Sequence, residues 1–147
     1  METKGIACVE TQIASEIAID NRQGAAQIAE RAADLIFRRA TVNDSLTPQA
    51  LRQDLIEFGW SLIRAQPAMA PLVNLVNSVL WAVQECQTTD TIIQAAGQTT
   101  EAFKRQIRQH ALHVAEGALT LIADGATIVT LSYSTTVQHA LRHAQRA

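Results

Sequence analysis

Apolar residues recur every three or four positions along most of the chain, which is the spacing of one face of an α-helix. Such stripes predict helices over residues 10–19, 24–39, 48–65, 70–86 and 91–123. Residues 70–86 have the broadest apolar surface, so we expect this helix at the centre of a bundle. The pattern therefore predicts a mainly α protein that begins with a helical bundle.

Two of these helices begin with residues that favour helix capping. Thr47 precedes Pro48, and Thr88-Thr89-Asp90 precedes the longest stripe. A threonine hydroxyl accepts a hydrogen bond from the first helical turn, and proline suits the first helical position. We therefore predict that Thr47 caps the helix that begins at residue 48, and that Thr88-Thr89-Asp90 caps the longest helix.

The longest helix and the two tryptophans yield further predictions about the core. We expect the longest helix to bury Phe103, Ile107, Val114, Ala118 and Leu121. Trp60 and Trp81 lie at helical spacing among apolar neighbours, so we predict them as core or interface anchors.

The periodicity changes near residue 124. Asp124-Gly125 indicates a turn, the β-branched run Ala126–Leu131 predicts a short strand, and residues 137–147 return to helical spacing. We therefore expect a helical domain over residues 1–123 and the first β-loop-α unit of an incomplete Rossmann-like domain over residues 124–147. A lone strand needs a partner for its backbone groups, from a longer polypeptide or another chain.

Composition and charge exclude several classes of protein. The 147-residue chain is 48% hydrophobic, with a mean hydropathy of +0.04, which excludes a disordered protein. A net charge of −2 and 4% aromatic residues predict no direct nucleic-acid partner. The N-terminal residues lack the apolar core of a signal peptide, and no apolar run is long enough for a bilayer. We expect a cytoplasmic protein without a membrane partner.

The loop from Ser132 to Thr136 is the strongest candidate site. It follows the predicted strand and precedes a helix, where free amide groups and the helix dipole favour an anion. Ser132, Ser134 and Thr135 supply hydroxyl groups there. Simple capping of the last helix by Ser134 or Thr135 explains the same residues.

Other reactive side chains are better explained without a site. His139 and His143 are four positions apart, but the metalloprotease carboxylate is absent between them, so we expect solvated histidines and no metal. Cys8 and Cys86 lack a positive neighbourhood and are expected to be unreactive. The short basic run Lys104, Arg105 and Arg108 is expected to be a solvated face. No cofactor is predicted.

Three stretches, in order, resemble the family of translation initiation factor 2B regulatory subunits. Gln23–Ala29 is similar to the family segment R-G-A-x-x-I-A, and Gln66–Asn74 is similar to R-P-T-A-V-x-L-x-N. Ile122–Ser134 is similar to I-x-D-G-D-x-I-L-T-H-x-x-S, at the entry to the family's Rossmann-like domain. Archaeal ribose-1,5-bisphosphate isomerase and methylthioribose-1-phosphate isomerase belong to the same superfamily. The resemblance covers nearly all of this chain but only the first part of a longer family protein.

The resemblance implies a ligand site with several departures from the isomerases. It places ligand-binding positions at Arg22, Gln23, Gly24, Ala25, Gln66, Ser132, Ser134 and Thr135. The isomerase cysteine position reads Ser132, and the two phosphate-binding arginines read Gln23 and Gln66, with Arg22 one position from the first. A serine hydroxyl is a far weaker acid than a thiol and needs an activating base for proton transfer. No catalytic residue is assigned.

Three hypotheses about function remain at this stage. The first is a non-catalytic initiation factor 2B-like protein or fragment that acts in assembly with itself or with homologous subunits and binds a sugar phosphate or nucleotide. The second is part of a sugar-phosphate aldose–ketose isomerase of the ribose-1,5-bisphosphate type. The third is a helical interaction domain whose resemblance is accidental, associating through its amphipathic faces or its unpaired strand.

Overall fold

The computed structural model describes residues 23–42, 47–131 and 134–146, and these residues are mainly helical. The helices are α2 (Ala25–Val42), α3 (Pro48–Ala65), α4 (Ala70–Val83), α5 (Thr89–Ala118), the short 3₁₀-helix η1 (Leu119–Leu121) and α6 (Thr135–Ala144). The helix predicted at residues 10–19, together with Cys8, lies outside the described residues.

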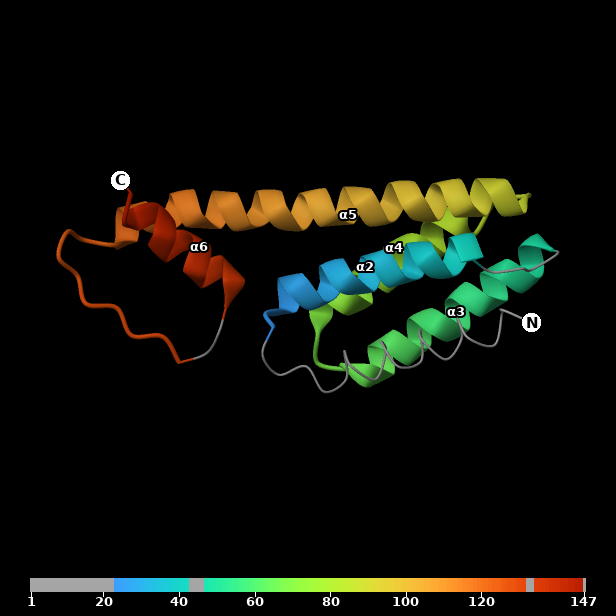
Figure 1. Ribbon diagram of the computed structural model, residues 1–147, viewed down its shortest axis with the longest axis horizontal. Helices are drawn as coiled ribbons and strands as arrows, with labels where there is room; N and C mark the ends of the chain where they lie inside the picture. The colour runs from blue at the N-terminus through green and yellow to red at the C-terminus, as the bar shows by residue number, and fades with distance from the viewer. Residues whose placement is uncertain (1–22, 43–46, 132–133, 147) are drawn as a thin grey trace.

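The helices α2 to α5 run alternately up and down to form an antiparallel bundle, and α5 extends well beyond the other three (Figure 1). The helix α4, predicted at the centre of the bundle, packs against α2, α3 and α5, but each of these helices likewise contacts the other three, so α4 has no special central place. It buries one apolar side, namely Leu72, Leu75, Val76, Val79 and Val83. The helix α6 folds back beside the C-terminal half of α5.

The predicted capping residues are confirmed. The Oγ1 atom of Thr47 accepts a hydrogen bond of 3.2 Å from the amide of Ala50, with Pro48 as the first residue of α3. At α5, Thr88 and Thr91 form a reciprocal capping box, in which each hydroxyl accepts from the other residue's amide at 3.2 Å. These bonds satisfy amide groups that have no partner within the helix.

The predicted buried stripe of the longest helix is wrong, because none of its five residues is buried. Phe103, Ile107 and Ala118 are half-buried, while Val114 and Leu121 are 53% and 85% exposed. The buried positions of α5 are Ile92, Ala96, Thr100 and Ala115. The reason is length, because α5 has 30 residues while α2 and α3 have 18 and α4 has 14. The C-terminal half of α5 therefore lacks helices on most sides.

The tryptophans do not lie in the core. Trp60 and Trp81 are 53% and 75% exposed, on the outer faces of α3 and α4. The core alternative is therefore wrong, since smaller residues such as Val76 and Gly59 fill the contact between these helices, while the interface alternative stays a prediction.

The strand predicted at Ala126–Leu131 is not formed in the described structure. Residues 126–130 have no regular secondary structure, and this segment runs as an open loop away from the bundle (Figure 1). Val129 and Leu131 are almost fully exposed. A strand exists only as part of a ladder, and the described residues offer this segment no second strand. The predicted turn at Asp124-Gly125 is present, with Gly125 at a φ of 72°.

Candidate functional site

The first turns of α2 and α6 meet at one end of the bundle, although 110 positions separate them in the sequence. Gly24, which immediately precedes α2, is buried against Thr135, the first residue of α6. A Cβ atom on Gly24 would lie 3.1 Å from the Oγ1 atom and 3.3 Å from the amide nitrogen of Thr135. Only a residue without a side chain permits this approach unless α6 shifts.

Ser134 caps α6, as the capping alternative predicted. Its Oγ atom accepts a hydrogen bond of 3.4 Å from the amide of Val137, and its carbonyl oxygen accepts one of 2.9 Å from Gln138. The amides of Thr135 and Thr136 lie in the first turn of α6, where no helical carbonyl group lies four residues earlier to accept from them. They therefore remain available to an acceptor from outside the helix. Capping by Ser134 and anion binding by the next two amides are therefore compatible.

A cleft of about 370 Å³ opens beside this junction, between α2, α5 and α6. Its lining consists of Ala26, Gln27, Glu30, Ile107, Arg108, Ala111, Leu112, Thr135 and His139. The apolar residues come mainly from α5, while Gln27, Thr135 and His139 supply hydrogen-bonding groups. The lining is thus mixed, as in sites for small polar ligands.

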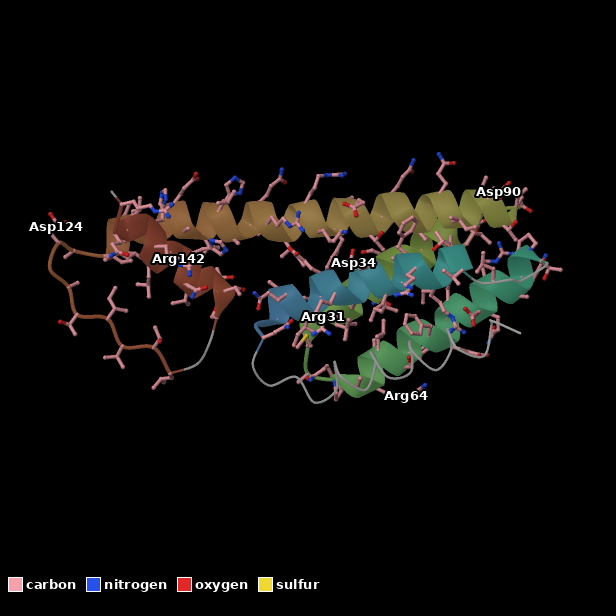
Figure 2. All side chains as sticks on the ribbon, in the orientation of Figure 1. Arg31, Asp34, Arg64, Asp90, Asp124 and Arg142 are labelled. Atoms are coloured by element: carbon pink, nitrogen blue, oxygen red, sulfur yellow. The ribbon has the colours of Figure 1, made fainter. Side chains whose placement is uncertain are left out.

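Ion pairs between α2 and α5 fix one wall of this cleft. The Nε and Nη2 atoms of Arg108 donate to the two carboxylate oxygens of Glu30 at 3.0 and 3.1 Å. One turn further along, the Nζ atom of Lys104 lies 2.6 Å from Asp34 and 2.5 Å from Glu101. Figure 2 shows Asp34 on the side of α2 that faces α5.

Both cations are stabilised by these carboxylates. The hydrogen bond to Glu30 raises the pKa of Arg108 above its usual value. The hydrogen bonds to Asp34 and then to Glu101 raise the pKa of Lys104, and partial burial opposes this effect. Arg108 therefore enters the cleft already hydrogen-bonded to an acid and is not a fully uncompensated charge.

The structure brings together only part of the predicted site. Gly24, Ala25, Ser134 and Thr135 gather at the junction, and Gln23 directly precedes Gly24. Gln66 instead ends α3, where its amide donates to the carbonyl oxygens of Leu62 and Ile63, and it does not line the cleft. Arg22 and Ser132 lie outside the described residues.

Gln27, Arg108 and His139 line the cleft but were not predicted as site residues. Arg108 and His139 were predicted as solvated surface residues, and both side chains are exposed at the cleft. Arg108 lies 78 positions from Glu30, so the sequence contains no local signal for their pairing. His139 is one turn after Thr135, and this spacing places both residues on one face of α6.

The remaining reactive groups of the described residues form no metal site. In residues 23–42, 47–131 and 134–146, no cluster of three or more His, Cys, Asp or Glu side chains is arranged to hold a metal ion. The thiol of Cys86 is half-buried and lies 3.5 and 3.6 Å from the carbonyl oxygens of Ala82 and Thr91. No helix in the described part of the chain is long and apolar enough to cross a membrane.

Comparison with known proteins finds a matching family model and a similar solved structure. The model of the initiation factor 2 subunit family matches residues 21–147. A crystal structure of the translation initiation factor eIF-2B of Pyrococcus horikoshii OT3 superposes with a TM-score of 0.78 at 23% sequence identity. The match covers 93% of this chain and 46% of that protein, so this chain spans about half the length of its structural relative. No curated protein sequence matches the chain.

Proposed function

Because this chain belongs to the initiation factor 2 subunit family, we propose that it is a non-catalytic, initiation factor 2B-like module of the cytoplasm that supports subunit assembly and binds a sugar phosphate or nucleotide at the junction of α2 and α6. The observation that carries the ligand site is the contact between Gly24 and Thr135, since it aligns two helix N-termini beside one cleft. Each N-terminus contributes unpaired amides and a partial positive charge.

Assembly is supported by the apolar side chains that the C-terminal part of the chain leaves exposed. Leu121, Ile128, Val129, Leu131 and Val137 are between 42% and 101% exposed. In our proposal residues 124–147 begin a Rossmann-like domain, and these side chains pack when further strands are supplied. Those strands come from the rest of a longer polypeptide or from a homologous subunit. The greater length of the archaeal relative is consistent with this arrangement.

A non-catalytic role is supported by the chemistry of the residues at the family's motif positions. Ser132, Gln23 and Gln66 replace a thiol and two cations. The cation that does reach the cleft, Arg108, is hydrogen-bonded to Glu30 of α2. A phosphate at the junction would therefore be held mainly by amides and hydroxyl groups, which predicts weak binding and no turnover.

The test is calorimetric titration of the chain with ribose 1,5-bisphosphate and with adenosine monophosphate, together with an assay for isomer formation. Thr135→Asp places a carboxylate at the first position of α6, where it suits the helix dipole but repels phosphate. Thr89→Asp makes the same change at the first position of α5 and is the matched control. We expect binding to be lost in Thr135→Asp and retained in Thr89→Asp.

Two results would overturn the proposal. Equal binding by both variants would exclude the junction as the ligand site. Conversion of ribose 1,5-bisphosphate to its ketose isomer by the purified chain would exclude the non-catalytic role.

A further inference from the structure

The charges of the chain are unevenly distributed along its length. The whole chain has a net charge of −2, yet residues 101–147 hold five Lys or Arg against three Asp or Glu. The same segment contains all four histidines. The C-terminal half of α5, with α6, is therefore a basic end on an acidic protein.

The basic residues of α6 share one face. His139, Arg142 and His143 are spaced by three and four positions, which places them on one side of the helix, and Arg146 lies in the turn that follows Ala144, the last residue of α6. With Leu112, Ala115 and Glu116 of α5 they line a cleft of about 250 Å³, which adjoins the cleft at the junction and shares Leu112 and His139 with it. We call these seven residues the α5/α6 face; Figure 2 shows Arg142 on α6 beside the end of α5.

The arginines of the α5/α6 face, Arg142 and Arg146, form no ion pair within the described residues. Lys104 and Arg108 are tied to carboxylates of α2, whereas the described part of the chain gives the side chains of Arg142, His143 and Arg146 no hydrogen bond or ion pair. All three are exposed, and Glu116 is the one acid among the residues lining their cleft. The positive charges of Arg142 and Arg146 are therefore free to attract an anionic group from outside.

The floor of the cleft is apolar. Leu112 is 56% exposed, and Ala115 is buried beneath it. A concave apolar floor with a basic rim suits a side chain that has an aliphatic part and a carboxylate at its end. It does not suit a nucleic-acid base, since the cleft is lined by no aromatic ring other than imidazole.

From this charge complementarity we propose that the α5/α6 face binds an acidic, amphipathic helix of a partner protein. The partner's apolar residues lie on Leu112, and its carboxylates pair with Arg142 and Arg146. The two adjoining sites are tested at different residues: the junction is tested at Thr135, which does not line the α5/α6 face, and the α5/α6 face is tested at Arg142 and Arg146, which do not line the cleft at the junction.

The proposal is tested by fluorescence anisotropy with a labelled model peptide of about 16 residues, long enough to form a helix. The peptide has Leu and Ala on one face and Glu on the other, and a matched peptide carries Lys in place of Glu. Titrations with the intact chain are made at low and high salt. Single-stranded RNA and vesicles containing phosphatidylserine are titrated in parallel.

The matched protein variants change two charges each. Arg142→Glu with Arg146→Glu reverses the α5/α6 face, and Arg38→Glu with Arg64→Glu makes the same change at exposed sites on α2 and α3. We expect the first pair to weaken binding of the acidic peptide by on the order of tenfold, and the control pair to change it by less than about twofold. Added salt is expected to weaken the interaction.

Three outcomes would overturn the proposal: equal loss of binding in both double variants, equal binding of the Glu and Lys peptides, or tighter binding to RNA or vesicles than to the acidic peptide. Hydrogen exchange measured by mass spectrometry verifies that α6 remains helical in each variant. A variant that loses helix is replaced by Arg142→Gln with Arg146→Gln, for which a smaller loss in the same direction is expected.

Discussion

Gly24 and Thr135 approach so closely that a methyl group on Gly24 would press on the hydroxyl and the amide of Thr135. The contact joins the start of α2, in the bundle, to the start of α6, at the far end of the chain. It therefore holds the N-terminal end of α6 against the bundle.

The first prediction concerns this contact. Gly24→Ala is expected to displace the first turn of α6, because the new Cβ atom would lie 3.1 Å from the Oγ1 atom of Thr135. Gly117→Ala is the control, since a Cβ atom there meets nothing within 4 Å. Hydrogen exchange measured by mass spectrometry should show faster exchange in α6 for Gly24→Ala and not for Gly117→Ala. Unchanged protection of α6 in both variants would contradict the contact.

The second prediction concerns the packing of α3 on α4. A Cβ atom on Gly59 would lie 2.6 Å from the Cγ1 atom of Val76, and both residues are buried. Gly59→Ala is therefore expected to lower the free energy of unfolding by about 1–3 kcal/mol, despite the better helix propensity of alanine. Urea denaturation measures this change.

A double-mutant cycle isolates the cause of that loss. Val76→Ala removes the methyl groups that the new Cβ atom would meet. The two substitutions together should cost less than the sum of their separate costs, by at least about 0.5 kcal/mol. Strict additivity would mean that the cost of Gly59→Ala arises elsewhere.

The third prediction is a loss of stability at alkaline pH. The hydrogen bonds to Asp34 and Glu101 raise the pKa of Lys104 in the folded chain. A raised pKa gives stability that is fully present below the unfolded-state pKa of about 10.4 and is lost as the pH rises through the folded-state pKa. Arg108 remains charged throughout this range.

Lys104→Met tests the assignment. Between about pH 9 and pH 11, the free energy of unfolding of the native chain should fall more steeply than that of Lys104→Met, because other alkaline groups titrate in both proteins. Parallel curves would show that Lys104 gains nothing from Asp34 and Glu101.

The fourth prediction concerns association through the C-terminal loop. Val129 and Leu131 are 82% and 101% exposed, and their backbone groups are available for pairing. We expect the chain to form dimers or larger species in sedimentation velocity, and Val129→Ser with Leu131→Ser to shift it to monomer. Val114→Ser, at an apolar position of α5 that is 53% exposed, should leave association unchanged. A native chain that is monomeric at all concentrations would contradict this prediction.

Local signals predicted much of the fold. The helix predicted at residues 48–65 is α3 with the same bounds, because Thr47-Pro48 begins it and Gln66-Pro67 ends it. The start of α5 followed from Thr88 in the same way, although the helix ends earlier than the predicted residue 123. Capping and proline effects operate within four residues, so the sequence alone displays them.

Features that depend on distant residues were predicted poorly. The strand at Ala126–Leu131 requires a neighbour that the described chain lacks, and the exposure of Trp81 depends on how α4 is rotated against α3. The pairing of Arg108 with Glu30 depends on the register of α5 along α2, which no pattern within either helix specifies. The candidate site was accordingly predicted at its two helix starts and missed along α5.

The length of α5 has a mechanical consequence. A helix of 30 residues spans about 45 Å, and the N-terminal half of α5 is embedded among α2, α3 and α4 while its other half carries α6. The N-terminal half is therefore held by the bundle, while the C-terminal half projects from it and contacts α6. A tilt of about 5° at the middle of α5 would move the end of the free half, about 22 Å away, by about 2 Å. A small change in the tilt of α5 within the bundle would therefore displace α6, and a displacement of α6 would in turn tilt α5 against α2, α3 and α4.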